Sequence, residues 1–360
     1  MSGERTESEV LDAIERRRRR PHVKVMDSHV TLAHGAGGKS SHVLTEALFL
    51  PALRNPLLEP LGDAAVVAAG GTRLAFSTDA FVVRPLSFPG GTIGDLAVNG
   101  TINDLAMAGA RPLCLSVAFI LEEGLAIDEL ETIVSSLAGA ARDAGVAVAT
   151  GDTKVVERGK ADGVYITTAG VGLLERRLDL SPVAIRPGDR VLVSGTIGDH
   201  GMAIMVARGE LELELDLPSD TAALHGLVDA LLDATDGVRC LRDPTRGGLA
   251  TVLNELALAA EVAVVLDEAA IPVRPEVNGA CEILGIDPLY VANEGKLVCI
   301  VDPAAADAAL AALRAHPLGA AAAIVGEVRP DPAGMVFLDT AFGGSRVVDM
   351  LAGDPLPRIC

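Results

Sequence analysis

From His29 onward the chain alternates between short apolar stretches, which are typical of strands, and longer segments with apolar residues at helical spacing. A short strand is predicted at 30–32, followed by the glycine-rich loop His34–Lys39 and a helix at 40–50. The other elements predicted in the first half are strands at 74–78, 113–120, 146–149 and 164–171 and helices at 92–108 and 126–144. This half is therefore expected to combine helices and strands.

The alternation is interrupted near 181–189, where Pro182, Pro187 and Gly188 cluster before a new strand. The chain has 360 residues, more than one core usually holds, so we predict two domains at 30–180 and 181–345. In the second half the pattern predicts helices around 200–208, 221–234, 247–260, 275–284 and 303–315, and strands around 190–194, 262–266, 296–301, 322–328 and 335–338.

Beyond Gly343-Gly344 the pattern gives way to a tail, 346–360, which contains two prolines and ends in Cys360. Prolines favour an extended path. Fifteen extended residues reach roughly 50 Å at ~3.3 Å each. We therefore predict a mobile tail that can visit more than one site.

Composition excludes several classes of protein. The net charge of −19 argues against a broad basic face that binds nucleic acid. No apolar run approaches the ~20 residues that span a membrane, and the N-terminus has no apolar signal segment, so we expect a cytoplasmic protein without membrane contact. Aromatic residues are 2% of the chain, so the core must be built from Ala, Val, Leu and Ile. The five cysteines include no CxxC pair, so neither a zinc site nor a disulfide framework is indicated.

Residues 1–29 differ from the rest because Glu15 is followed by five arginines, Arg16 to Arg20. This run is either a basic arm that contacts nucleic acid or an acidic partner, or a disordered, solvated extension. A third interpretation is that translation begins at Met26, just before the first strand-like segment. We favour the last two interpretations together.

Acidic residues recur in the first half beside glycines or after apolar segments, at Asp63, Asp79, Asp104 and Asp152. Carboxylates of this kind hold Mg²⁺ and share it with nucleotide phosphates, although a single Asp in a turn more often shapes that turn. Asp95, Asn99 and Asn103 follow at i, i+4 and i+8 and so share one polar helix face, which would support such a site.

Three glycine-rich turns accompany these acids, at His34–Lys39, Gly195–Gly198 and Asp243–Gly248. Backbone N–H groups at a helix N-terminus attract phosphate. None of the turns matches the Walker A or Rossmann spacing, so each alone is more often a tight turn.

Three further residues can carry chemistry, namely Lys154, Glu294 and Cys360. Lys154 and Glu294 are candidates for phosphate neutralisation and for proton transfer, although each is more often a solvated residue. His200 follows Gly198-Asp199 and is expected only to begin a helix. Cys360 is either a reactive thiol, whose thiolate Arg358 would favour, or an unpaired thiol without a role.

Taken together, the motifs resemble the AIR-synthase-related superfamily and, within it, closely resemble the HypE family of hydrogenase expression/formation proteins. The similarity extends over about 30–360, and its most specific parts are TGDTKVV and the terminal PRIC. The matching segments are LAHGAGGKS (32–40), LAFSTDAFVV (74–83), FPGGTIGDLAVNGTINDLAMAGA (88–110), ILEEGL (120–125), TGDTKVVERG (150–159), VLVSGTIGDHG (191–201), LRDPTRGGL (241–249), ANEGKLV (292–298) and PLPRIC (355–360).

The resemblance implies an α+β, two-domain AIR-synthase-like (PurM-like) fold. It has an N-terminal α+β domain that dimerises through its sheet, a C-terminal α/β domain and a flexible tail. It implies ATP and Mg²⁺ as cofactors, with Asp63, Asp79, Asp104 and Asp152 as metal ligands. The cofactor-binding set also includes Asn103, Gly151, Thr153, Thr245 and Gly247.

The resemblance further implies a reaction. The carbamoyltransferase HypF loads a carbamoyl group onto Cys360, and ATP-dependent dehydration converts the thiocarbamate to a thiocyanate. Lys154 and Glu294 face the modified cysteine, with the order of their roles open. The cyanide passes to iron on the HypC–HypD complex.

Two other readings remain. One is a different enzyme of the superfamily, such as AIR synthase, selenophosphate synthetase or thiamine-phosphate kinase. The selenophosphate enzyme uses a cysteine or selenocysteine in the N-terminal glycine-rich loop, whereas His34–Ser41 contains none. The other is a non-catalytic scaffold that binds iron or a partner through Cys360, although a scaffold needs no acidic ATP site.

Overall fold

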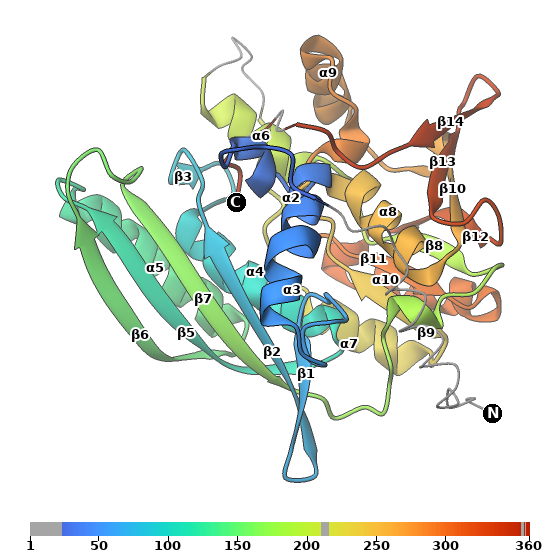
Figure 1. Ribbon diagram of the computed structural model, residues 1–360, viewed down its shortest axis with the longest axis horizontal. Helices are drawn as coiled ribbons and strands as arrows, with labels where there is room; N and C mark the ends of the chain where they lie inside the picture. The colour runs from blue at the N-terminus through green and yellow to red at the C-terminus, as the bar shows by residue number, and fades with distance from the viewer. Residues whose placement is uncertain (1–23, 210–215, 354–355, 357) are drawn as a thin grey trace.

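The computed structural model describes residues 24–209, 216–353, 356 and 358–360, so the arginine run at 16–20 lies outside the described residues. Two sheets lie side by side, one in each half of the chain (Figure 1). The change from one sheet to the other falls between Leu173 and Arg190, which spans the predicted domain boundary. Within the described part of the chain, no helix is both long and apolar enough to cross a membrane.

The five-stranded sheet of the first half has the order β1-β2-β7-β5-β6, and its pairs are antiparallel except for β5 with β6. Its strands are β1 (Ala65–Ala69), β2 (Thr72–Phe81), β5 (Arg111–Glu122), β6 (Ala147–Val156) and β7 (Val164–Leu173), and a separate hairpin joins β3 (Ser87–Phe88) to β4 (Gly91–Thr92).

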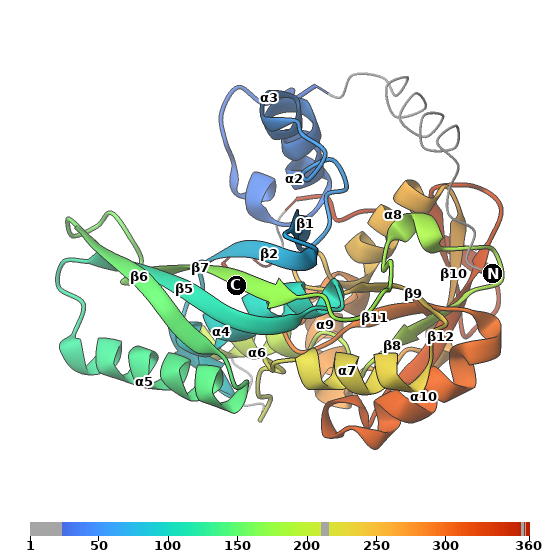
Figure 2. The ribbon, with the colours of Figure 1, turned by 90° about the horizontal axis from the view of Figure 1, so that it is seen from below.

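Two helices cover one face of this sheet, α4 (Ile93–Met107) against the strands and α5 (Ile127–Asp143) beside it (Figure 2). The Thr92 side chain caps α4 by accepting a 3.0 Å hydrogen bond from the Gly94 N–H. Nearly all of α4 is buried, whereas α5 buries the stripe Ile133, Leu137 and Ala141.

The other face of the sheet is uncovered in the single chain. Side chains alternate along β2, so Ala75 and Ser77 are buried while Phe76 between them is 47% exposed. Ile120 of β5 is also exposed on this face. An apolar sheet face of this kind indicates a surface for another chain.

The seven-stranded sheet of the second half has the order β14-β13-β10-β12-β8-β11-β9. Its strands are β8 (Arg190–Val193), β9 (Val238–Arg242), β10 (Ala263–Asp267), β11 (Val298–Val301), β12 (Ala323–Arg329), β13 (Met335–Asp339) and β14 (Ser345–Val348). Val191 and Val193 pack into the core that includes α8 (Gly248–Ala260), while Leu192 packs with α7 (His225–Ala234) and α10 (Ala306–Ala315). Both faces are thus buried, which explains the continuous apolar strands. The half is completed by α6 (Asp199–Ala207) and α9 (Pro275–Leu284).

The N-terminal segment corrects one prediction. The expected strand at 30–32 is wrong, because Leu32–Gly35 forms a 3-10 turn instead. The expected helix at 40–50 is present as α2 (Lys39–Leu44), a π-helical turn at Thr45–Phe49 and α3 (Leu50–Leu53).

The C-terminal tail is placed differently from the prediction. Its expected start at 346 falls inside β14, which pairs with β13. The chain then returns to the first half: the Lys39 N–H donates to the Leu351 carbonyl at 2.9 Å, and Ile359 forms an antiparallel bridge with Val83. The described end of the tail is therefore docked against the protein here, with Ile359 5% exposed.

Candidate active site

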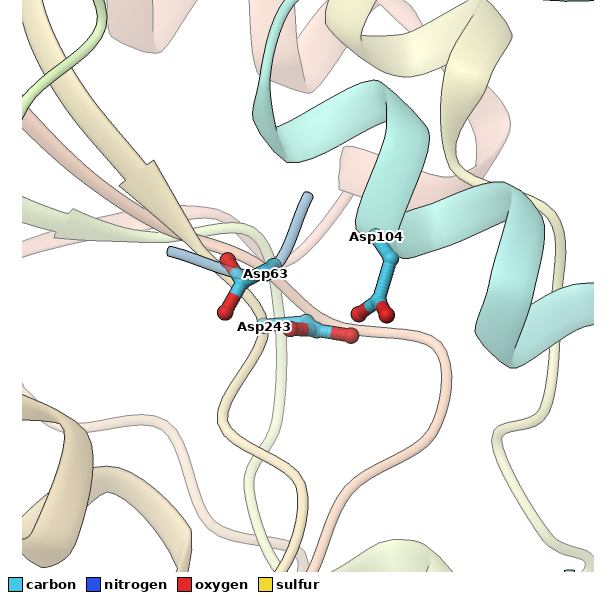
Figure 3. Close-up of side chains that lie close together, drawn as sticks. All are labelled: Asp63, Asp104 and Asp243. Carbon is cyan, nitrogen blue, oxygen red and sulfur yellow. The ribbon is translucent and has the colours of Figure 1, made fainter. Parts of the chain in front are cut away.

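Three carboxyl groups from separate segments meet between the two halves of the chain. Asp63 precedes β1, Asp104 lies on α4 and Asp243 follows β9, and their oxygen atoms lie within 4.8 Å of one another (Figure 3). Burial, together with the neighbouring carboxyl groups, raises the pKa of Asp104 and of Asp243 well above the usual range. The pKa of Asp63 is also raised by burial, although its ion pair with Arg242 opposes that shift.

Asp79 extends this cluster from β2. It pairs in register with Thr168, whose side chain is buried, so both face α4. Burial raises the pKa of Asp79, while Arg246 and a hydrogen bond from Asp104 lower it. Two carboxyl groups share a hydrogen bond only when one of them is protonated, which agrees with the raised pKa values.

The donor set fits a hard divalent cation. Asp63, Asp104 and Asp243 offer only carboxylate oxygens, the ligands that Mg²⁺ prefers. Crowded carboxylates repel one another in a buried site, and a bound cation would remove that repulsion. Sequence reasoning missed Asp243 as a ligand, although the residue follows a strand directly, because β9 itself was not predicted.

Cys360 lies at the other end of the same site. The residue is half-buried, and burial raises the pKa of its thiol. A hydrogen bond with Glu294 and the charges of Glu294 and Asp79 act in the same direction, while Arg246 lowers this pKa. The expectation that Arg358 favours the thiolate is wrong, since its guanidinium pairs with Asp162 at 2.5 Å.

Glu294 connects the cysteine to the acidic cluster. Its side chain is 3% exposed, and within the described residues its Oε1 atom has no hydrogen-bond partner. Burial raises its pKa well above the usual range, with further contributions from Asp220, Asp243 and Asp79. A buried carboxyl oxygen without a partner beside a thiol indicates a place for a reacting group.

Two of the three glycine-rich turns border this thiol. All three open helices, because Gly38, Gly198 and Gly247 precede α2, α6 and α8. The first and third turns pack together, since a Cβ on Gly37 would lie 2.6 Å from Cβ of Arg246. Gly247 has a φ of +77°, and the Thr245 carbonyl closes its turn by accepting a 2.9 Å hydrogen bond from the Gly248 N–H. A pocket between the two turns is lined by Gly35, Ala36, Arg246, Gly247, Ile359 and Cys360.

The polar face of α4 has a different use from the one expected. The Asn103 amide donates to the main-chain carbonyls of Ala222 and Glu294, and its Oδ1 atom accepts from the Leu224 N–H. Asn99 donates to the Thr221 hydroxyl at 3.1 Å. In this structure the face holds the segment 221–224, and Asn103 acts on the site through Glu294.

Four predicted site residues lie away from this cluster on the edge strand β6. Lys154 pairs with its neighbour Asp152 at 2.6 Å, and both side chains are exposed. Lys154 pairs in register with the exposed Ile120, so it points from the uncovered face, opposite to Asp79. A single chain therefore does not bring Gly151, Asp152, Thr153 or Lys154 to Cys360.

Comparison with known proteins identifies the family. Residues 61–174 match the N-terminal domain of AIR synthase related proteins, and residues 186–339 match their C-terminal domain. The carbamoyl dehydratase HypE of Cupriavidus necator is 55% identical over 339 residues, which cover 94% of this chain and 97% of that protein. The chain belongs to the HypE family.

Solved HypE structures share the fold. A crystal structure of a HypE–HypF complex matches with a TM-score of 0.81 at 45% identity, covering 86% of this chain and 99% of that one. A crystal structure of HypE in complex with ATP matches with a TM-score of 0.78 at 48% identity, covering 92% and 100%. The predicted family and its two-domain α+β fold are confirmed, and the other enzymes of the superfamily are set aside.

Proposed function

We propose that the chain is an ATP-dependent carbamoyl dehydratase that acts on its own Cys360. It converts the thiocarbamate S–C(=O)–NH₂ to the thiocyanate S–C≡N, which supplies the cyanide ligand for the iron of nickel–iron hydrogenases. The observation that carries this proposal is the half-buried thiol of Cys360, hydrogen-bonded to Glu294 in a site that also contains the acidic cluster. Relatives with the name carbamoyl dehydratase support it.

The residues of the chain divide the work between binding and proton transfer. Asp63, Asp104 and Asp243, with Asp79, would hold Mg²⁺, and the turns at Gly37 and Gly247 would offer backbone N–H groups to phosphate. Bound ATP supplies the phosphoryl group that turns the carbonyl oxygen into a leaving group. The positive charge of Arg246 lowers the pKa of both Cys360 and Asp79. The same charge would stabilise negative charge that develops near these two side chains during the reaction.

Glu294 is suited to remove a proton from the substrate nitrogen. Formation of the C≡N bond requires both nitrogen protons to leave while the oxygen departs as phosphate. A carboxylate with a raised pKa is a stronger base than an exposed one, and Glu294 hydrogen-bonds the sulfur that carries the group. Its Oε1 atom, which has no hydrogen-bond partner among the residues that the structure describes, provides the acceptor. Lys154 is the second candidate for proton transfer.

Lys154 and Asp152 would reach the site in a homodimer. The uncovered sheet face carries Phe76 and Ile120, which are exposed in one chain. Packing of this face against a second copy would bury those side chains and set β6 of one chain beside the site of the other. Asp152 would then join the ligands of Mg²⁺–ATP across the interface, with Gly151 and Thr153 nearby.

Partners and location follow from the chemistry. We infer that HypF loads the carbamoyl group onto Cys360 and that the HypC–HypD complex receives the cyanide. The solved HypE–HypF complex supports the first partner. A free thiol carrier that depends on ATP suits the reducing cytoplasm, and the net charge of −19 disfavours binding to nucleic acid.

Intact-protein mass spectrometry tests the proposal. The chain is incubated with HypF, carbamoyl phosphate and ATP, and the mass is followed with and without Mg²⁺. We expect a carbamoyl adduct on Cys360 that loses one water only with Mg²⁺ and ATP. ATP turnover without an adduct on Cys360 would overturn the proposal in favour of a free small-molecule substrate.

Cys360→Ser is the matched variant. It keeps the size and burial of the side chain but replaces the sulfur, so we expect no thiocarbamate while ATP binding is retained. A non-catalytic scaffold would turn over no ATP in either protein. ATP turnover that requires Cys360 therefore separates the enzyme from the scaffold.

A further inference from the structure

The end of the tail is held by a set of contacts that the reaction chemistry does not use. Residues 358–360 run antiparallel to 82–84: the Val82 N–H donates to a main-chain carboxylate oxygen of Cys360 at 3.0 Å, and the Arg84 N–H donates to the Arg358 carbonyl at 3.2 Å. The tail thus lies as a short strand beside residues 82–84, which directly follow β2. This pairing fixes the register of the last residues.

His200 binds the carbonyl between these two. Its Nε2 atom lies 2.6 Å from the Ile359 carbonyl oxygen, and its Nδ1 atom lies 2.7 Å from Oγ of Ser219. A carbonyl oxygen only accepts, so Nε2 carries the hydrogen and Nδ1 accepts from the Ser219 hydroxyl. Ser219 Oγ in turn accepts from the Thr221 N–H at 3.1 Å, which fixes its orientation. The ring is fully buried, and burial lowers its pKa, which favours the neutral form that these two bonds require.

Arg208 adds a second attachment just after α6. Its Nε atom donates to the Arg84 carbonyl at 2.7 Å, and its Nη2 atom donates to the Arg358 carbonyl at 2.6 Å. One guanidinium therefore joins the tail to the segment on which the tail lies. On the other side, Asp162 pairs with the side chains of both Arg84 and Arg358.

We propose that His200 and Arg208 are positioning residues that dock the tail and fix the thiol of Cys360 beside Glu294. Neither side chain needs to touch the reacting atoms, because His200 binds the main-chain carbonyl of Ile359 and Arg208 binds that of Arg358. The backbone contacts require no particular sequence in the tail, whereas the Asp162–Arg358 pair selects an arginine two residues before the thiol. The docked position is the one that places the thiol beside Glu294 for dehydration. This step rests on the proposed function.

Alkylation of Cys360 measures docking without reference to the reaction. The full chain is treated with N-ethylmaleimide, and peptide mass spectrometry gives the rate at Cys360, with the half-buried Cys114 of β5 as internal reference. A docked, half-buried thiol reacts more slowly than one on an open tail. Loss of the neutral His200 bond should speed alkylation about fivefold, and loss of the charged Arg208 bond to the Arg358 carbonyl on the order of tenfold.

The variants are Arg208→Ala, His200→Ala and His200→Gln. Glutamine can donate to the Ile359 carbonyl, so we expect it to restore part of the protection. Arg186→Ala is the matched control, because Arg186 also donates to two carbonyls, those of Val183 and Ile185, away from the tail. Should His200→Ala fail to fold, Arg208→Ala at the partly exposed end of α6 still tests the dock.

The reaction provides a second readout. In Arg208→Ala and His200→Ala, we expect the carbamoyl group to load at the wild-type rate, while ATP-dependent loss of water slows and the KM for ATP is unchanged. Alkylation of Cys360 at the wild-type rate in Arg208→Ala and His200→Ala would overturn the proposal that these residues dock the tail, even if dehydration is intact. Faster alkylation in the variants would support docking of the tail by His200 and Arg208. If no protein, wild type included, then lost water, the proposed function would be refuted instead.

Discussion

Asn103 donates a 3.0 Å hydrogen bond from its side-chain amide to the main-chain carbonyl of Glu294. A helix of the first half thereby fixes the position of a carboxyl group supplied by the second half. The amide makes two further bonds, to the Ala222 carbonyl and from the Leu224 N–H. Its role is thus to hold the two halves in register around the site.

Asn103→Ala should lower the free energy of unfolding by about 2–4 kcal/mol, because three buried main-chain groups would lose their partner. Urea unfolding followed by circular dichroism measures the loss. Asn278→Ala, on the exposed surface of α9, is the control and should change stability by less than about 0.5 kcal/mol. Equal stability of the two variants would contradict the assignment.

His200 should make stability depend on pH. Burial lowers its pKa in the folded chain, despite the nearby charge of Asp220 and the bond to Ile359. The unfolded chain therefore takes up a proton first as the pH falls below about 6.5. Stability from this group is present above that pH and is lost below it, by at most about 1.4 kcal/mol per pH unit.

The measurement is the difference in unfolding free energy between wild type and His200→Gln from pH 7.5 to 5. The pKa of His225 is also lowered by burial, but that residue is present in both proteins and cancels. We expect the wild type to lose more stability on acidification. Parallel pH profiles would show that His200 does not titrate as assigned.

Asp104→Asn should abolish the stabilisation of the folded chain that Mg²⁺ gives in the absence of ATP. Magnesium at 100 times its dissociation constant stabilises a single site by about 2.7 kcal/mol. The pKa of Asp104 is raised by burial and by its acidic neighbours, so Mg²⁺ must displace a proton and should stabilise wild type more at pH 8 than at pH 6. Calorimetry checks both effects, with the exposed Asp128→Asn as control. An unchanged Mg²⁺ response in Asp104→Asn would remove this carboxylate from the metal site.

Phe76→Glu should dissociate the proposed homodimer. The phenyl ring is 47% exposed on the uncovered sheet face, and two-fold symmetry would bury each added carboxylate in the interface. We expect the dissociation constant to rise by roughly 100-fold or more, as measured by sedimentation. Phe342→Glu is the matched control, because that ring is fully exposed in the turn between β13 and β14. A monomeric wild type would reject the dimer outright.

The main helices and strands of the first half follow from local patterns, whereas several short strands do not. The α4 and α5 helices and the β2, β5 and β7 strands appear where apolar periodicity predicts them. The β9 strand was missed because arginines interrupt its apolar residues, and β14 was missed because it follows two glycines. β6 continues past Gly151 to Val156 because it pairs with β5 over that length. In these three strands, pairing with other strands determines where the strand forms and ends.

The site was predictable in its residue types and less so in its geometry. Asp63, Asp79 and Asp104 were identified from sequence, but only the folded chain shows that Asp243 joins them. The sequence around His200 indicates a helix start, and the tail it binds lies far along the chain. Prolines predict an extended tail without indicating where it docks. Which face of β6 carries Lys154 depends on strand register, which sequence alone does not fix.

Lys154 provides the last and sharpest test, because it lies on the opposite sheet face from Asp79 in its own chain. If Lys154 acts across a homodimer, two inactive variants should complement each other. A dimer of Lys154→Ala with Cys360→Ser contains one complete site, formed by Cys360 of the first chain and Lys154 of the second. Mixed in equal amounts, the variants should recover roughly a quarter of wild-type dehydration, since half of the dimers are mixed and each has one working site.

The mixing experiment uses denatured and refolded chains, with each variant refolded alone as the blank. Mass spectrometry follows the ATP-dependent loss of water from the Lys154→Ala chain, which alone retains Cys360. If Lys154 instead served the cysteine of its own chain, the mixture would remain as inactive as the separate variants. Activity of Lys154→Ala by itself would exclude the lysine from proton transfer and leave Glu294 as the base.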